Sequence, residues 1–87
     1  YKRQTLTIEN ELGMHARAAT VFVQLASKYS CEVTVEKDGQ RVNGKSIMGI
    51  MMLAAGSGSK LTIHTDSPKA DDLFEELKQL FASLDPV

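Results

Sequence analysis

The sequence has only one cysteine, Cys31, which excludes a disulfide bond within the chain. A lone cysteine suits a reducing compartment, and because Cys31 opens a strand-like segment we expect a small buried thiol there. No apolar run approaches the roughly 20 residues that a membrane-spanning helix needs, and no secretory signal is visible. We therefore expect a cytoplasmic protein without membrane insertion, although a chain that begins with Tyr1 instead of methionine leaves room for residues before it.

The sequence also has no excess of charge of either sign. Ten Lys and Arg residues stand against eleven Asp and Glu residues, for a formal net charge of −1. This balance gives no indication of nucleic acid or an anionic membrane as a partner. A hydrophobic content of 43% and a charged content of 24% in 87 residues are typical of a globular protein. We expect one small domain over residues 1–87.

Apolar periodicity predicts four strands and three helices in the order β-α-β-β-α-β-α. The predicted strands cover residues 2–9, 32–37, 40–43 and 60–65, and the predicted helices cover residues 16–28, 47–55 and 68–84. Asp38-Gly39 predicts a two-residue hairpin turn, because both of its positions need a positive φ. Ser46 and Ser67 are the expected N-caps of the second and third helices. This order predicts an α+β fold, with the helices on one face of a largely antiparallel sheet.

The segment Gly13-Met14-His15-Ala16-Arg17 places an imidazole at the first turn of the first helix. A helix N-terminus carries unpaired N–H groups and a partial positive charge, so it can hold an anion. A neutral imidazole is a nitrogen nucleophile, and the Arg17 guanidinium suits phosphate oxygens. The segment therefore indicates a histidine that carries phosphate. Taken alone it is a short motif, and a surface histidine that caps a helix beside an unrelated arginine stays an open alternative.

The second predicted helix supplies a further indication, because residues 47–55 contain no polar side chain. In a small two-layer domain one side of each helix faces solvent, so part of this run forms an exposed apolar patch. The candidates for the patch are Ile47, Met48, Met51 and Met52. Methionine adapts to several partner surfaces, which suits a docking patch beside a phosphorylatable histidine. The alternative is a helix that lies fully buried under the third helix.

Other kinds of site have little support. No paired carboxylate, serine nucleophile or metal cluster accompanies His15, so nothing else supports a small hydrolase with His15 as general base. His64 alternates out of step with Leu61 and Ile63, and we expect it to be a solvated surface histidine. A metal site of His15, His64 and Cys31 would need three separate elements without chelating spacing. We therefore expect neither a metal nor a cofactor.

Two segments together resemble the signature sequences of the histidine-containing phosphocarrier family, HPr. They are Gly13-Met14-His15-Ala16-Arg17 and Asn43-Gly44-Lys45-Ser46-Ile47-Met48-Gly49-Ile50-Met51-Met52-Leu53. The resemblance covers essentially the whole chain, including the order of the elements. It implies an open-faced β-sandwich, with three helices on one side of a four-stranded antiparallel sheet in the order 1-4-2-3.

The resemblance also implies roles for individual residues. His15 would be phosphorylated on Nδ1 by Enzyme I, with phosphoenolpyruvate as the original donor, and would pass the group to a IIA protein or domain. Arg17 and the backbone amides of Ala16 and Arg17 would hold the phosphate. The residues that would line the docking surface are Thr20, Ile47, Met48 and Met51, with Met52 of the apolar helix beside them. The protein would be a carrier and not an enzyme, and we expect a monomer.

Two positions, Ala18 and Ser46, leave open which branch of the family the chain belongs to and whether it is regulated by phosphorylation of a serine. Sugar-branch members of the family usually have proline where this chain has Ala18, whereas alanine is more familiar in the nitrogen-branch, NPr-type paralogues. Ser46 matches a serine that an HPr kinase/phosphorylase modifies in some bacteria, and its hydroxyl can cap the second helix in any case. The downstream acceptor therefore stays undetermined. A pure adaptor that docks through the methionine patch without phosphoryl chemistry is the alternative from another class.

Overall fold

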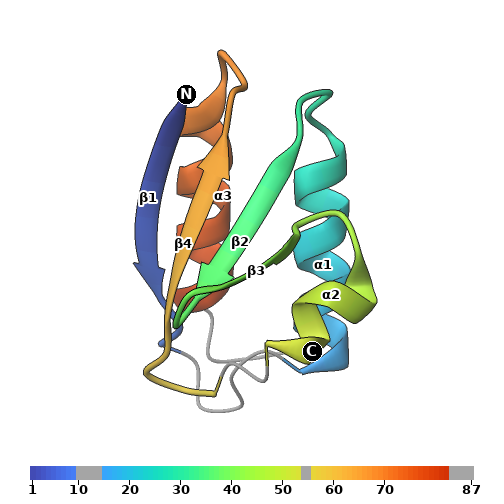
Figure 1. Cartoon of the computed structure of the whole chain (residues 1–87), viewed down its shortest axis with the longest axis vertical. Coiled ribbons are helices and arrows are strands. Elements are labelled where there is room, and N and C mark those ends of the chain that lie inside the picture. The colour runs from blue at the N-terminus through green and yellow to red at the C-terminus, as the bar shows by residue number, and fades with distance from the viewer. Residues whose placement is uncertain (10–14, 54–55, 83–87) are drawn as a thin grey trace.

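The computed structural model describes residues 1–9, 15–53 and 56–82. Four antiparallel strands form one sheet in the order β1-β4-β2-β3, as the family resemblance implies. The strands are β1 (Lys2–Thr7), β2 (Val33–Lys37), β3 (Gln40–Asn43) and β4 (Lys60–Thr65). The helices are α1 (Ala16–Ser27), α2 (Ile47–Met52) and α3 (Ala70–Ala82). Figure 1 shows α1 and α3 behind the sheet and the front face of the sheet without a helix, which confirms the predicted α+β fold.

The core lies between the sheet and the helices. Alternate residues of the two central strands are fully buried, and the apolar faces of α1 and α3 cover them. The strand residues are Val33, Val35, Leu61 and Ile63. Phe22 of α1 and Phe81 of α3 stack with their ring centroids 6.0 Å apart, so the two helices share one aromatic contact beneath the sheet.

Local signals in the sequence predicted the hairpin between β2 and β3 correctly. Asp38 has a φ of 52° and Gly39 has a φ of 84°, as a turn that follows the strand twist requires. The register that results pairs Lys37 with Gln40 and Val35 with Val42.

Several element boundaries differ from the prediction. The third helix begins at Ala70 and not at Pro68, because Ser67 first forms a turn: its Oγ accepts from the Lys69 N–H at 3.1 Å. The carbonyl of Ser67 accepts from the Ala70 N–H at 3.1 Å. Smaller differences are that β1 ends at Thr7, α1 at Ser27, α2 at Met52, and that β2 begins at Val33. The predictions for Gly13, Met14, residues 54–55 and residues 83–86 lie outside the described residues.

The expectation of a buried thiol at Cys31 is wrong. Cys31 is half-buried, and it lies in the connection between α1 and β2 and not in a strand. The strand pattern begins two residues later, at Val33, so Cys31 does not take part in the inward-facing alternation. None of the helices among the described residues is long and apolar enough to cross a membrane.

Candidate functional site

His15 is the N-cap of α1 and not a residue of its first turn. Its backbone is extended, with φ −93° and ψ 177°, and its Nδ1 accepts from the Ala18 backbone N–H at 3.4 Å. The carbonyl of His15 accepts from the Ala19 N–H at 2.9 Å. Because Nδ1 accepts this bond, the proton of a neutral His15 ring lies on Nε2. The Nδ1 lone pair therefore points at the N-terminal end of the helix.

The first turn of α1 supplies donors beside this nitrogen. The helix itself offers no carbonyl for the N–H groups of Ala16 and Arg17, as for the first residues of any helix. Both residues are exposed. Thr20 is half-buried, and its Oγ1 donates to the Ala16 carbonyl at 2.9 Å, which ties it to the helix. This end of α1 thus combines an imidazole nitrogen, two amides that have no carbonyl partner within the helix, and a guanidinium, a set that suits an oxyanion.

Ser46 is the N-cap of α2, as the sequence predicts. Its Oγ accepts from the Gly49 N–H at 3.1 Å, and its carbonyl accepts from the Ile50 N–H at 3.0 Å. Gly49 lets α2 lie close to β3, because a Cβ at this position would stand 3.3 Å from the Cβ of Val42. The serine caps the first turn of α2, and the glycine lets the helix lie close to β3.

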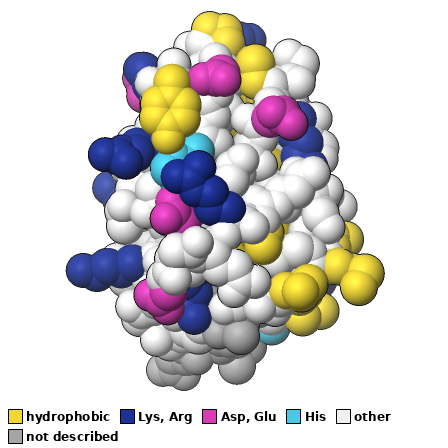
Figure 2. Space-filling view, viewed as in Figure 1, with side chains coloured by type: hydrophobic (Ala, Val, Ile, Leu, Met, Phe, Trp, Pro, Cys, Tyr) yellow, Lys and Arg dark blue, Asp and Glu magenta, His cyan; other side chains and the backbone are white. Residues whose placement is uncertain are grey.

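The apolar run of α2 is divided between core and surface. Ile50 and Leu53 are buried, whereas four side chains remain exposed: Ile47 at 43%, Met48 at 76%, Met51 at 40% and Met52 at 67%. We call these four residues the α2 patch, and Figure 2 shows hydrophobic side chains gathered at this corner of the molecule. The predicted exposure is confirmed, and the alternative of a fully buried helix is wrong.

The α2 patch lies on the same side of the molecule as the N-terminal half of α1. Helices α1 and α2 contact each other, and Figure 1 shows α2 beside the part of α1 where the helix begins. The fold therefore brings the two sequence segments into one region, although about 30 residues separate them in the chain.

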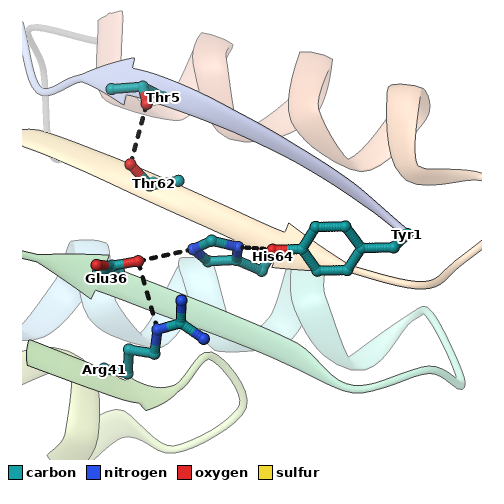
Figure 3. Close-up of polar contacts among 6 residues, drawn as sticks. All are labelled: Tyr1, Thr5, Glu36, Arg41, Thr62 and His64. Carbon is teal, nitrogen blue, oxygen red and sulfur yellow. Dashed lines mark hydrogen bonds and ion pairs between the residues drawn. The ribbon is translucent and has the colours of Figure 1, made fainter. Parts of the chain in front are cut away.

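The expectation that His64 is a solvated surface histidine is wrong, because its side chain is only 4% exposed. Its Nε2 lies 2.9 Å from Oε1 of Glu36, and its Nδ1 is hydrogen-bonded to the Tyr1 hydroxyl. Strand β4 is central, so side chains from both neighbouring strands can cover its outer face (Figure 3). The alternation predicted the correct face of the strand but could not show that neighbours cover it.

Among the described residues, two groups with shifted pKa values lie away from His15, where the end of α1 meets α3. The hydrogen bond from the Lys28 ammonium, at 2.5 Å, and that from the Tyr29 hydroxyl, at 2.8 Å, hold the pKa of Glu76 below its usual range. Burial and the Glu76 carboxylate raise the pKa of Tyr29 to about 12. This cluster joins two helices, and sequence reasoning missed it because nothing in the local pattern connects residues so far apart.

Comparison with known proteins gives the family. Residues 2–83 match the family model described as "PTS HPr component phosphorylation site". The chain is 46% identical to the phosphocarrier protein HPr of Cupriavidus necator over 77 residues, which are 88% of this chain and 86% of that protein. It is 47% identical over 76 residues to the HPr of Pseudomonas aeruginosa, covering 86% of this chain and 84% of that protein.

The fold agrees with this match. The crystal structure of HPr-C-His from Thermoanaerobacter tengcongensis has a TM-score of 0.85 and 41% sequence identity, and the match covers 93% of this chain and 91% of that chain. The chain therefore belongs to the HPr family of phosphocarrier proteins of the phosphotransferase system.

Proposed function

We propose that this protein accepts a phosphoryl group on Nδ1 of His15 from Enzyme I and passes it to a IIA protein or domain. The observation that carries the proposal is the placement of Nδ1 at the start of α1, where it accepts a long hydrogen bond from the Ala18 N–H. A nitrogen held in this way keeps its lone pair close to backbone donors that suit phosphate oxygens. The bond at 3.4 Å is weak enough to give way to an incoming phosphorus atom.

The transfer asks little of the carrier beyond positioning and charge stabilisation. Nδ1 attacks the phosphorus, and the leaving group stays with the donor. The phosphohistidine then gains about two negative charges, which the amides of Ala16 and Arg17 and the Arg17 guanidinium stabilise. In the second transfer the acceptor on the next protein attacks the phosphorus and the bond to Nδ1 breaks. His15 thereby returns to its starting state. On this proposal the protein is a carrier without a complete active site of its own, and needs no metal or cofactor.

The α2 patch supports docking of the two partners in turn. Four exposed apolar side chains next to α1 form a surface that can be desolvated when a partner covers it. We include Thr20 of α1 in the proposed docking surface, because its hydroxyl lies one turn from the helix start, bonded to the Ala16 carbonyl. Flexible methionine side chains can fit more than one partner, as a carrier that visits Enzyme I and a IIA protein requires. We propose that it does so in the cytoplasm as a monomer, and that residues 1–87 act as one domain.

Incubation with Enzyme I and labelled phosphoenolpyruvate tests the phosphocarrier role. We expect one acid-labile phosphoryl group per molecule on the wild-type protein and none on His15→Ala. Circular dichroism of His15→Ala serves as the control that the fold is retained. Labelling that persists in His15→Ala would refute the assignment of His15, and a complete lack of labelling of the wild-type protein would favour the adaptor alternative.

We propose that Ser46 is a regulatory phosphorylation site for an HPr kinase/phosphorylase where the host has this enzyme. A phosphate on Oγ would lie at the start of α2, so it would not oppose the helix dipole. It would also place negative charge beside Ile47, at the edge of the α2 patch. Mapping of phosphoserine after incubation with host lysate and ATP tests this, and unmodified Ser46 would end the proposal.

The nitrogen-branch, NPr-type reading remains a second candidate because of Ala18. This residue is buried, and its N–H is the group that donates to His15 Nδ1. A proline at this position would have no N–H to donate. The two branches therefore differ in a direct contact with the reacting nitrogen. Assays of phosphoryl transfer to IIA proteins of both branches would identify the acceptor. The IIA protein that receives the group faster indicates the branch to which this chain belongs.

A further inference from the structure

The outer face of the sheet carries a second ordered histidine, which the proposed carrier function does not use. His64 lies on the central strand β4, 4% exposed, between Arg3 of β1 and Thr34 of β2 in the register of the sheet. Its Nε2 contacts Glu36 of β2, and its Nδ1 contacts the hydroxyl of Tyr1. Figure 3 shows the three side chains in a line across the face of the sheet.

The hydrogen bonds assign the roles within this line. The Glu36 carboxylate can only accept, so the Nε2 of a neutral His64 carries the proton and donates it. Nδ1 therefore accepts, and the Tyr1 hydroxyl donates to it. Arg41 of β3 lies on the other side of the carboxylate, with its Nε 3.4 Å from Oε1 of Glu36, and holds that group in place. Glu36 contacts the imidazole, Arg41 lies beyond Glu36, and Arg3 lies on the neighbouring strand. Glu32 and Asp66 line the same hollow as His64.

A hydroxyl, an imidazole and a carboxylate in this order form the arrangement of an activated nucleophile. The imidazole can take the proton of the hydroxyl as the oxygen attacks, and the carboxylate keeps the imidazole in the required tautomer. Tyr1 is 75% exposed, so a reagent in solution can reach its oxygen, while the base behind it is shielded from water. We propose that the Tyr1 hydroxyl is an acyl-accepting nucleophile and that His64 is its general base.

The surroundings of Tyr1 indicate the class of donor. A hollow of about 110 Å³ adjoins Tyr1, His64 and Thr34, which has room for a short acyl group, since a water molecule takes about 30 Å³ in the liquid. Its rim carries the carboxylates of Glu32 and Asp66, the guanidinium of Arg41 and the Tyr1 ammonium, which lies 3.5 Å from Asp66. Both cations at the rim are already paired with carboxylates, the ammonium with Asp66 and Arg41 with Glu36, so they attract an acyl phosphate little. The fitting donor is an uncharged activated ester or thioester.

The reaction balances without a further reagent. The Tyr1 oxygen attacks the carbonyl carbon of the ester while its proton passes to Nδ1 of His64. The bond from the carbonyl carbon to the leaving oxygen or sulfur breaks, and the leaving group departs with the electron pair. The product is O-acyl-Tyr1, and the proton on His64 is then released to the leaving group or to water.

The test uses p-nitrophenyl acetate with the full chain and peptide mapping by mass spectrometry. Addition of acetyl to Tyr1, reversed by hydroxylamine, distinguishes an ester from acetylated lysine. The reference is N-acetyltyrosinamide under the same conditions, which accounts for the intrinsic reactivity of an exposed phenol. We expect Tyr1 at pH 7 to react at least about tenfold faster than the reference, below the 10²–10⁴ that positioned bases contribute in enzymes.

Two variants test the base, and Tyr1→Phe confirms the acylated residue. His64→Gln can still donate to Glu36 but has no base toward Tyr1. Glu36→Gln can donate to Nε2, which would place the ring proton on Nδ1, the wrong tautomer. We expect both variants to react within about twofold of the reference amide, with urea unfolding as the control for folding. Wild-type reactivity equal to that of the reference, or unchanged reactivity in a folded His64→Gln, would overturn the proposal.

The pH dependence of the acylation rate distinguishes a general base at His64 from a histidine with a purely structural role. The rate of the reference amide should rise about tenfold per pH unit below pH 10, since only its phenolate reacts. The rate of Tyr1 should instead rise less steeply with pH, because His64 takes the proton of the hydroxyl as the oxygen attacks. A Tyr1 profile parallel to that of the reference would overturn the proposal. None of these measurements involves phosphoryl transfer, so their outcome is independent of the role of His15.

Discussion

One nitrogen of His15 has two roles at the residue scale. Nδ1 caps the first turn of α1 by accepting from the Ala18 N–H, and it carries the lone pair that the proposed phosphoryl transfer uses. The cap favours the tautomer with the proton on Nε2, so it prepares Nδ1 as a nucleophile before any donor arrives. Sequence reasoning placed His15 at the helix end but could not assign the tautomer, because that depends on the torsion of the side chain.

The variant Ala18→Pro tests this preparation. Proline fits the first turn of a helix but removes the N–H, so the preference for the Nε2-protonated form should weaken. Long-range ¹H–¹⁵N spectra of the imidazole should show mainly the Nε2-H tautomer in the wild-type protein and a mixture in the variant. Ala18→Ser, which keeps the N–H, is the matched control. Identical ¹⁵N shifts of His15 in all three proteins would contradict the role of Ala18.

Glu76 is a second residue whose protonation has a consequence for the whole chain. Its pKa is lowered in the folded state, by Lys28 first and then by Tyr29. A lowered pKa adds stability above the unfolded value of about 4.3, and this stability is lost as the pH falls through the folded pKa. We expect the urea midpoint to fall between about pH 5 and pH 3. In Glu76→Gln this fall should be smaller, and a fall of equal size would show that other carboxylates cause it.

At the scale of elements, α2 combines a stability role with a surface role. Its N-cap stabilises its first turn and its glycine lets it lie close to β3, while the α2 patch stays exposed. The two roles rest on different residues, so substitutions can separate them.

The variants of Ser46 test this separation. Ser46→Ala loses the cap and should lower the free energy of unfolding by about 1 kcal/mol. Ser46→Asp keeps a capping oxygen, so its stability in urea should stay close to that of the wild-type protein, while its charge should slow phosphoryl transfer from Enzyme I. Equal transfer rates for Ser46→Asp and the wild-type protein would argue against Ser46 as a regulatory position.

The variant Met48→Asp tests the α2 patch itself. Met48 is 76% exposed, so aspartate should leave the urea midpoint nearly unchanged, yet a charge buried under a partner is costly. We expect Enzyme I to bind at least tenfold more weakly, measured by titration calorimetry. Gln79→Asp adds the same charge to an exposed position of α3 and should bind like the wild-type protein. A similar loss in both variants would indicate an effect of net charge and not of the patch.

At the scale of the whole molecule, the core contact between α1 and α3 connects all the layers. Phe22 is fully buried and stacks on Phe81 beneath the sheet. Phe22→Ala should therefore cost about 3–5 kcal/mol, a large part of the roughly 5–15 kcal/mol that stabilises a typical domain. Urea unfolding followed by circular dichroism measures this. The exposed residue Gln24 of the same helix is the control, since Gln24→Ala should change the stability by less than about 0.5 kcal/mol.

Much of the molecule could be predicted because the signals are local. The period of the apolar residues set the order of strands and helices, Asp38-Gly39 set the hairpin, and the absence of polar side chains in residues 47–55 indicated the α2 patch. Each of these depends on residues within one or two turns of each other. The start of the third helix was predicted too early, at Pro68. A turn stabilised by Ser67 comes first, so the helix begins at Ala70.

The sequence by itself thus determined the elements, the exposed patch and the helix end that carries His15. Only the tertiary structure decided the surroundings of His64 and Glu76, whose hydrogen-bond partners lie 28 to 63 positions away in the chain. Periodicity reports which face of a strand a residue occupies, but burial of a polar side chain depends on which strands lie beside it. For His64 the central position of β4 was decisive, and it turned an expected solvated histidine into a buried one.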